Sequence, residues 1–82
     1  MYEITYSRIA LKKLSKLEKP LKERILNSLE RIRIRPESYI KKLVGNSYYS
    51  LRVGDYRIIL NLTKNQLKIL VLTLGHRKKA YK

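Results

Sequence analysis

The stretch that decides the fold spans residues 48–60 and reads YYSLRVGDYRIIL. Its centre, Gly54-Asp55, can form a two-residue hairpin loop, so the stretch is predicted to be two antiparallel strands. That loop places Arg52 directly opposite Arg57, and like charges opposed across a sheet destabilise it. The alternate positions form an apolar face suited to a core: Tyr49, Leu51, Val53, Tyr56, Ile58 and Leu60. The opposed arginines therefore need an explanation.

The residues before the hairpin predict one strand and two helices. Residues 2–6 (YEITY) alternate and favour a strand. Ser7 can cap a first helix that ends before Pro20, and Pro20 suits the first turn of a second helix. An apolar stripe repeats along that second helix at intervals of three and four residues until Pro36 stops it. The two helices should form a basic helical hairpin.

The rest of the chain predicts a connector and one more strand. Residues 37–46 form a connector with room for one helical turn, and residues 63–66 (TKNQ) form a turn. Residues 67–74 (LKILVLTL) are apolar almost throughout, as expected of a strand covered on both faces. Residues 75–82 are a basic tail. We predict one α+β domain over residues 1–82, ordered strand, helix, helix, three strands, with the helices on one face of a mainly antiparallel sheet.

Charge is the strongest global property of the chain. Twenty Lys and Arg oppose six Asp and Glu, giving a formal net charge of +14 at pH 7. Such a field attracts polyanions, with nucleic acid first, an acidic protein second and a membrane surface a distant third. The absence of cysteine fits a reducing cytosol. No apolar run approaches the roughly 20 residues that cross a bilayer, so we expect a cytoplasmic protein with no membrane partner.

The residue types available restrict the chemistry. His76 is the only histidine and the acids are scattered, so neither a metal site nor a cofactor is expected. Arginines can grip a phosphate bidentately and stabilise the extra charge of a pentacoordinate phosphorane. In RNA the 2′-OH can itself attack the neighbouring phosphate. An anion at Arg52 and Arg57 would explain why they face each other; the alternative is that both extend into water, where screening leaves little cost.

Three segments carry a resemblance to a known family. LRVGDYRIIL at 51–60, LGHRKKAY at 74–81 and KKLVG at 41–45 resemble the RelE/ParE toxin superfamily, as does the order of elements. The resemblance covers essentially the whole chain, and its motifs are specific in combination only. RelE-type members are metal-independent, ribosome-dependent endoribonucleases that cut mRNA through 2′-OH attack. The resemblance therefore implies a cognate antitoxin, the ribosome and mRNA as partners.

The resemblance also assigns roles to individual residues. Arg57 matches the phosphate-stabilising arginine just after the hairpin turn, and Arg77 matches an arginine of similar role after the last strand. Tyr81 matches, with variable spacing, a C-terminal tyrosine that stacks on the base or assists proton transfer. Arg52 matches a basic position on the strand before the turn. These residues are the expected catalytic and RNA-binding set.

One departure concerns proton transfer. RelE-type enzymes often carry lysines on the first hairpin strand, whereas this chain has Tyr48 and Ser50 there. A general acid or base contributes roughly 10²–10⁴-fold, so Tyr48, His76 or Lys42 would have to take over. His76 suits this because the unperturbed pKa of histidine is about 6.5, although an ordinary exposed or strand-end histidine is the slightly favoured interpretation. Lys41 and Lys42 are expected to contact RNA phosphates or solvate the connector.

Three functions stay open from the sequence. The first is an mRNA endoribonuclease toxin neutralised by an acidic antitoxin, and the second is a ParE-like inhibitor of DNA gyrase. The third is a non-catalytic basic module that binds RNA or the ribosome. The set Arg57, Arg77 and Tyr81 favours the first, since ParE-type members generally lack the complete set. The missing strand lysines keep the third open.

Overall fold

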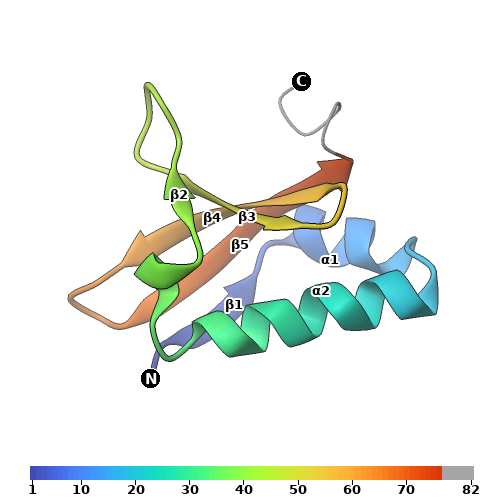
Figure 1. Cartoon of the computed structure of the whole chain (residues 1–82), viewed down its shortest axis with the longest axis horizontal. Helices are drawn as coiled ribbons and strands as arrows, with labels where there is room; N and C mark the ends of the chain where they lie inside the picture. The colour runs from blue at the N-terminus through green and yellow to red at the C-terminus, as the bar shows by residue number, and fades with distance from the viewer. Residues whose placement is uncertain (77–82) are drawn as a thin grey trace.

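Two α-helices and five strands make up residues 1–76, the part of the chain that the computed structural model describes. The elements follow in the order β1 (Glu3–Tyr6), α1 (Arg8–Ser15), α2 (Lys19–Ile32), the short 3₁₀ helix η1 (Pro36–Ser38), β2 (Lys41–Lys42), β3 (Tyr49–Val53), β4 (Tyr56–Thr63) and β5 (Lys68–His76). The strands form one sheet in the order β1-β5-β4-β3-β2 (Figure 1). Three pairings are antiparallel and β1 pairs with β5 in parallel, so the predicted α+β class is confirmed.

The helices begin and end for the reasons that the sequence predicts. Ser7 has an extended backbone, and its hydroxyl accepts a hydrogen bond from the Ala10 N–H at 3.0 Å. The same hydroxyl donates to the Leu72 carbonyl at 2.6 Å, which ties the start of α1 to β5. Pro20 lies in the first turn of α2, where its missing N–H costs nothing. The second helix ends at Ile32, ahead of Pro36.

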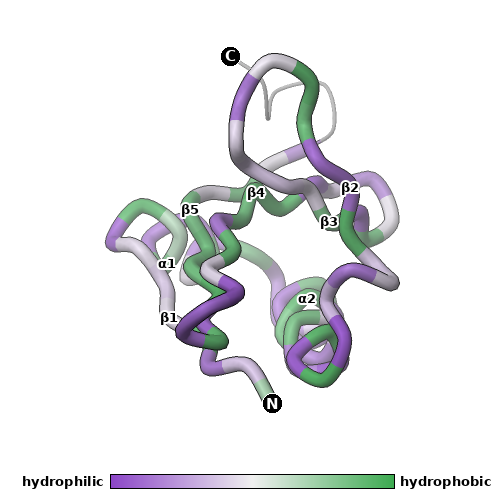
Figure 2. The backbone as a smooth tube through the Cα atoms, turned by 90° about the vertical axis from the view of Figure 1, so that its left-hand side faces the viewer, coloured by the Kyte–Doolittle hydropathy of each residue, from purple (hydrophilic) through white to green (hydrophobic). Residues whose placement is uncertain are grey.

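The core lies between the helices and one face of the sheet. In Figure 2, α2 runs along the concave side of the curved sheet. The apolar stripe of α2 is buried, as are two residues of α1. These helical residues form one cluster with the sheet residues that face them: Ala10, Leu14, Ile25, Leu29, Ile32, Leu51, Val53, Ile58, Leu60, Ile69, Val71 and Leu74. The opposite face of the hairpin is left without a helix.

The hairpin has the predicted register. Arg52 pairs with Arg57, and Leu51 pairs with Ile58. Gly54 begins the turn at φ +59°, a left-handed conformation that glycine adopts without a Cβ penalty. A Cβ at Gly54 would lie 3.3 Å from a guanidinium nitrogen of Arg24, so α2 packs closely against this turn.

Two expectations for the remaining strands need correction. The connector contains β2, whose two residues pair with β3, as well as the expected helical turn, η1. The last strand begins after Leu67, which has φ 53°, and continues to His76. Its second face is only partly covered, because Leu70 and Leu72 are half-buried. Within residues 1–76, no helix is long and apolar enough to cross a membrane.

Candidate nucleic-acid interface

The face of the sheet without helices carries a row of cationic side chains. Since side chains alternate along a strand, Arg52 and Arg57 lie opposite each other on this open face while their neighbours enter the core. The next residue across the sheet from Arg57 is Gly75 of β5, which has no side chain. Lys41 joins the face because β2 pairs it with Ser50. The cross-strand neighbour of Arg57 on β5 is thus a glycine, and the cationic side chains come from β2, β3 and β4.

Two adjoining hollows lie on this face. The larger has a volume of about 440 Å³ and the smaller about 160 Å³. Lys41, Ser50 and Arg57 line both of them. The other lining residues of the larger hollow are Lys42, Leu43, Val44 and Asn46, and those of the smaller are Tyr39 and Arg52. The three shared residues therefore come from three different strands and mark the centre of the candidate site.

The charges around these hollows favour an anion. Four of the lining residues are cationic and none is acidic: Lys41, Lys42, Arg52 and Arg57. The Nε of Arg52 donates to the Gly54 carbonyl at 3.3 Å, which holds the start of that side chain along the hairpin turn. Within residues 1–76, no group of three or more His, Cys, Asp or Glu side chains could hold a metal ion. Arginine and lysine donors on an open face suit phosphate groups.

The loop between β2 and β3 forms one wall of the larger hollow. It is closed by a hydrogen bond from the Leu43 N–H to the Tyr48 carbonyl at 2.9 Å, and the Tyr48 N–H donates to Asn46 Oδ1 at 2.8 Å. The loop projects from the sheet in Figure 1 and carries Val44 fully exposed. Tyr48 is 40% exposed but lines neither hollow. Of the residues that the sequence singled out, the structure brings Lys41, Lys42, Arg52 and Arg57 together around the hollows, whereas Tyr48 lies beside them.

His76 lies on the other face of the sheet. Its cross-strand partner is Tyr56, and the two rings meet edge to face with centroids 5.9 Å apart. Tyr56 packs against the core, so His76 points to the helix side while Arg57 points to the open side. The structure does not bring His76 together with Arg57, and a catalytic role for His76 stays an untested prediction. Arg77 and Tyr81 lie outside the described residues.

Sequence reasoning missed Tyr39 and Asn46 as site residues. Tyr39 is 49% exposed and follows η1, where its N–H donates to the Pro36 carbonyl at 2.9 Å. Both residues reach the site only because β2 brings the connector alongside β3. A two-residue strand leaves no periodic pattern, so no signal in the sequence predicted this arrangement.

The fold is similar to that of solved RelE toxins. The archaeal RelE-RelB complex from Pyrococcus horikoshii is 28% identical, with a TM-score of 0.81 over 96% of this chain and 98% of that one. The RelBE2 complex from Mycobacterium tuberculosis is 20% identical, with a TM-score of 0.84 over 93% of this chain and 98% of that chain. The matching chain of the intact E. coli RelBE complex is 22% identical, with a TM-score of 0.80 over 93% of this chain and 96% of that chain.

The family assignment comes from the sequence match. Residues 4–81 match the model of the ParE toxin of type II toxin-antitoxin systems. The chain belongs to this family, which lies within the RelE/ParE superfamily, and the resemblance seen in the sequence is confirmed. No curated protein matches the chain.

Proposed function

We propose that this protein is a toxin that cleaves mRNA on the ribosome without a metal ion. The observation that carries the proposal is the cationic hollow shared by Lys41, Ser50 and Arg57 on the open face. The likeness to an archaeal RelE over nearly the whole of both chains supports the same activity. A positively charged, acid-free hollow of this kind can bind a scissile phosphate and stabilise its transition state.

The proposed reaction is an intramolecular transesterification. The 2′-OH attacks the adjacent phosphorus and loses its proton, while the 5′-oxygen of the next nucleotide leaves and gains a proton. The products are a 2′,3′-cyclic phosphate and a 5′-hydroxyl. Arg57 would stabilise the negative charge that develops on the phosphoryl oxygens, with Arg52 and Lys41 beside it. From the family resemblance, we assign Arg77 a similar role and Tyr81 the role of stacking on the base.

The proposed silencing partner is an antitoxin. Two of the solved structures named above are toxin-antitoxin complexes, and the third is a complex of RelE with RelB. With a net charge of +14, this chain favours an acidic partner. Carboxylates of that antitoxin would occupy the Arg52–Arg57 face in the silent complex, and RNA phosphate would occupy it in the active toxin. Both states place an anion at the opposed arginines.

Gyrase inhibition is the second candidate function. The family model that matches describes ParE toxins. The hairpin strand also carries Tyr48 and Ser50 at the positions where RelE-type enzymes often have lysines. A toxin that acts by binding gyrase needs neither of those lysines.

The deciding experiment is toeprinting of mRNA on programmed ribosomes. Wild type and three variants are compared: Arg57→Ala, Arg77→Ala and Arg8→Ala. Arg8 is an exposed residue of α1 that lines neither hollow, so its variant controls for the loss of one positive charge. We expect cleavage in the decoding site by wild type and Arg8→Ala, and a rate about 10²–10³-fold lower for Arg57→Ala.

Two results would contradict the proposal in different ways. Equal cleavage by wild type and Arg57→Ala would remove the catalytic assignment of the open face. No cleavage by folded wild type, with inhibition of DNA supercoiling by gyrase in a parallel assay, would replace the nuclease by the second candidate. His76→Ala in the same toeprinting series tests the remaining proton-transfer prediction.

A further inference from the structure

A third hollow lies where α2 ends and η1 begins. Its volume is about 310 Å³, and it is lined by Arg31, Ile34, Arg35, Ser38 and Tyr39. The helix stops at Ile32, and Arg35 precedes Pro36 with an extended φ of −147°. This change of direction brings Arg35 back beside Arg31 around one hollow. The chain thus builds a second cationic surface from residues close together in sequence.

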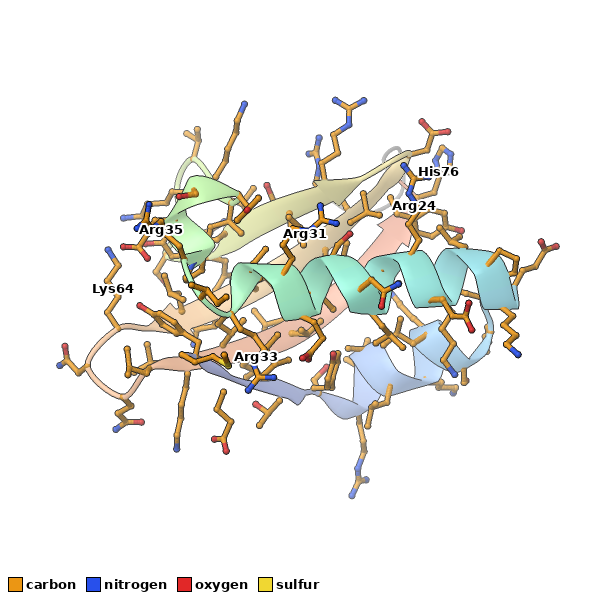
Figure 3. All side chains as sticks on the ribbon, turned by 60° about the horizontal axis from the view of Figure 1, so that its bottom comes forward. Arg24, Arg31, Arg33, Arg35, Lys64 and His76 are labelled. Atoms are coloured by element: carbon orange, nitrogen blue, oxygen red, sulfur yellow. The ribbon has the colours of Figure 1, made fainter. Side chains whose placement is uncertain are left out.

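The side chains of the two arginines of this hollow have no partner within residues 1–76. The guanidinium groups of Arg31 and Arg35 make no hydrogen bond or ion pair with any described residue. The acids nearby are directed elsewhere, since Glu30 pairs with Arg33 at 2.8 Å and Glu37 approaches Lys64 at 4.0 Å. Figure 3 shows Arg31 and Arg35 extending on one side of the end of α2 while Arg33 points to the other. Both guanidinium groups are therefore open to an external anion.

Tyr39 connects this hollow with the candidate site. It lines the third hollow beside Arg31 and Arg35, and it also lines the smaller hollow beside Arg52 and Arg57. Its backbone is fixed because the Tyr39 N–H donates to the Pro36 carbonyl, while its side chain is 49% exposed. One half-exposed ring thus lies between two pairs of arginines. Aromatic rings alternating with cationic side chains are the surface that single-stranded nucleic acid binds.

We propose that Arg31, Arg35 and Tyr39 bind the RNA next to the nucleotide held at Arg57. A base would stack on Tyr39, and the neighbouring phosphate would be held by Arg31 and Arg35. This inference rests on the proposed function, because it extends the same RNA track around the edge of the sheet. Ile34, which is 73% exposed at the rim, adds an apolar surface for a sugar or base.

The test measures binding of fluorescently labelled, fully 2′-O-methylated single-stranded RNA, which cannot be cleaved by 2′-OH attack. A short oligonucleotide that fills only the Arg57 site is compared with a longer one that reaches Tyr39. The double variant R31A/R35A and the single variant Tyr39→Ala are compared with the charge-matched double variant R8A/K12A. Both control residues are exposed on α1 and line none of these hollows.

We expect the longer RNA to bind wild type more tightly than the shorter one. Tyr39→Ala should weaken the longer RNA about tenfold, because one base no longer stacks. R31A/R35A should weaken it further at low salt and reduce the steepness of log affinity against log salt by about 0.7, since one phosphate contact on single-stranded RNA accounts for about 0.7. Neither change should alter binding of the short RNA, and circular dichroism should confirm that each variant is folded.

Three results would overturn the inference. The first is equal binding of long and short RNA by wild type, and the second is R31A/R35A behaving like R8A/K12A. The third is unchanged RNA binding by R31A/R35A with weakened binding of a poly-glutamate peptide, which would assign the surface to an acidic protein. The toeprinting assay separates these outcomes from failure of the proposed function, since wild type would still cleave mRNA in each of them.

Discussion

The two faces of the β3–β4 hairpin differ in almost every property although they are built from alternating residues. On the helix side, Leu51 and Val53 are each 5% exposed and Ile58 is fully buried. The open side carries Arg52, which lies between Leu51 and Val53, and Arg57, which directly precedes Ile58. One face contributes apolar burial to stability, and the other gathers positive charge at some expense in stability. Adjacent substitutions should therefore change different properties of the protein.

The largest effect is expected from Ile58→Ala. Ile58 is 0% exposed within the core cluster, so truncation leaves a cavity and should lower the free energy of unfolding by about 2–5 kcal/mol. Urea denaturation followed by circular dichroism measures this decrease. Arg57→Ala, one residue earlier, should change the unfolding free energy far less while removing cleavage.

A result in which Arg57 contributes to stability as Ile58 does would contradict this comparison of the two faces. A stability decrease for Arg57→Ala as large as that for Ile58→Ala would mean that Arg57 mainly supports the fold. Ile58→Val provides the matched control, because it removes one methyl group and should cost about 0.5–1.5 kcal/mol.

The hairpin could be predicted from the sequence because its register depends on local residues only. Gly54 at φ +59° starts a two-residue loop, and that loop alone pairs Arg52 with Arg57. The helices were equally predictable from the Ser7 cap and the position of Pro20. In each case the deciding interaction lies within a few residues of the element that it defines.

The parts that could not be predicted depend on long-range pairing. The pairing of β2 with β3 brings Lys41 to Ser50, and two residues are too few to show a period. The side of the sheet to which each residue at the end of β5 points depends on an irregularity in the β4–β5 pairing. The register of this pairing shifts between Ile59 and Leu60 of β4. That shift sets Gly75 beside Arg57 and turns His76 to the helix side. An irregularity of this kind leaves no local signature, so the sequence could not show that His76 and Arg57 lie on opposite faces.

A smaller effect on the helix side is expected from Tyr6 at alkaline pH. Burial raises the pKa of the Tyr6 hydroxyl above 10.0; the charge of Glu30 raises it further, while Arg33 opposes this. The folded protein then holds its proton to higher pH than the unfolded chain. Stability is unaffected below pH 10 and falls as pH rises through the folded pKa. Tyr6→Phe cannot ionise, so its stability should fall less between neutral pH and a pH above 10.

Exposed Tyr48→Phe is the control for this measurement. Tyr48 is 40% exposed, so its replacement should leave the alkaline decrease in unfolding free energy as large as in wild type. Equal pH dependence in wild type and Tyr6→Phe would show that ionisation of Tyr6 does not contribute to alkaline unfolding.

The smallest effect belongs to the opposed arginines themselves. Arg52→Thr removes one of two like charges that face each other and substitutes a residue that favours strands, so the free protein should become more stable by a few tenths of a kcal/mol. The change also removes the 3.3 Å hydrogen bond from Arg52 to the Gly54 carbonyl, which reduces the gain. The sharper signal is salt dependence, since screening should shrink the difference from wild type as ionic strength rises.

Arg52→Lys keeps the positive charge, so the difference between its stability and that of wild type should not change with ionic strength. If Arg52→Thr were less stable than wild type at every salt concentration, the two arginines would not repel measurably in the free protein. The pair would then need no anion to explain it, and the case for a phosphate at this face would rest on the cleavage and RNA-binding assays alone. A stability gain that disappears on saturation with RNA would instead show that the same repulsion is relieved by the ligand, because an anion at the pair stabilises wild type more than the variant.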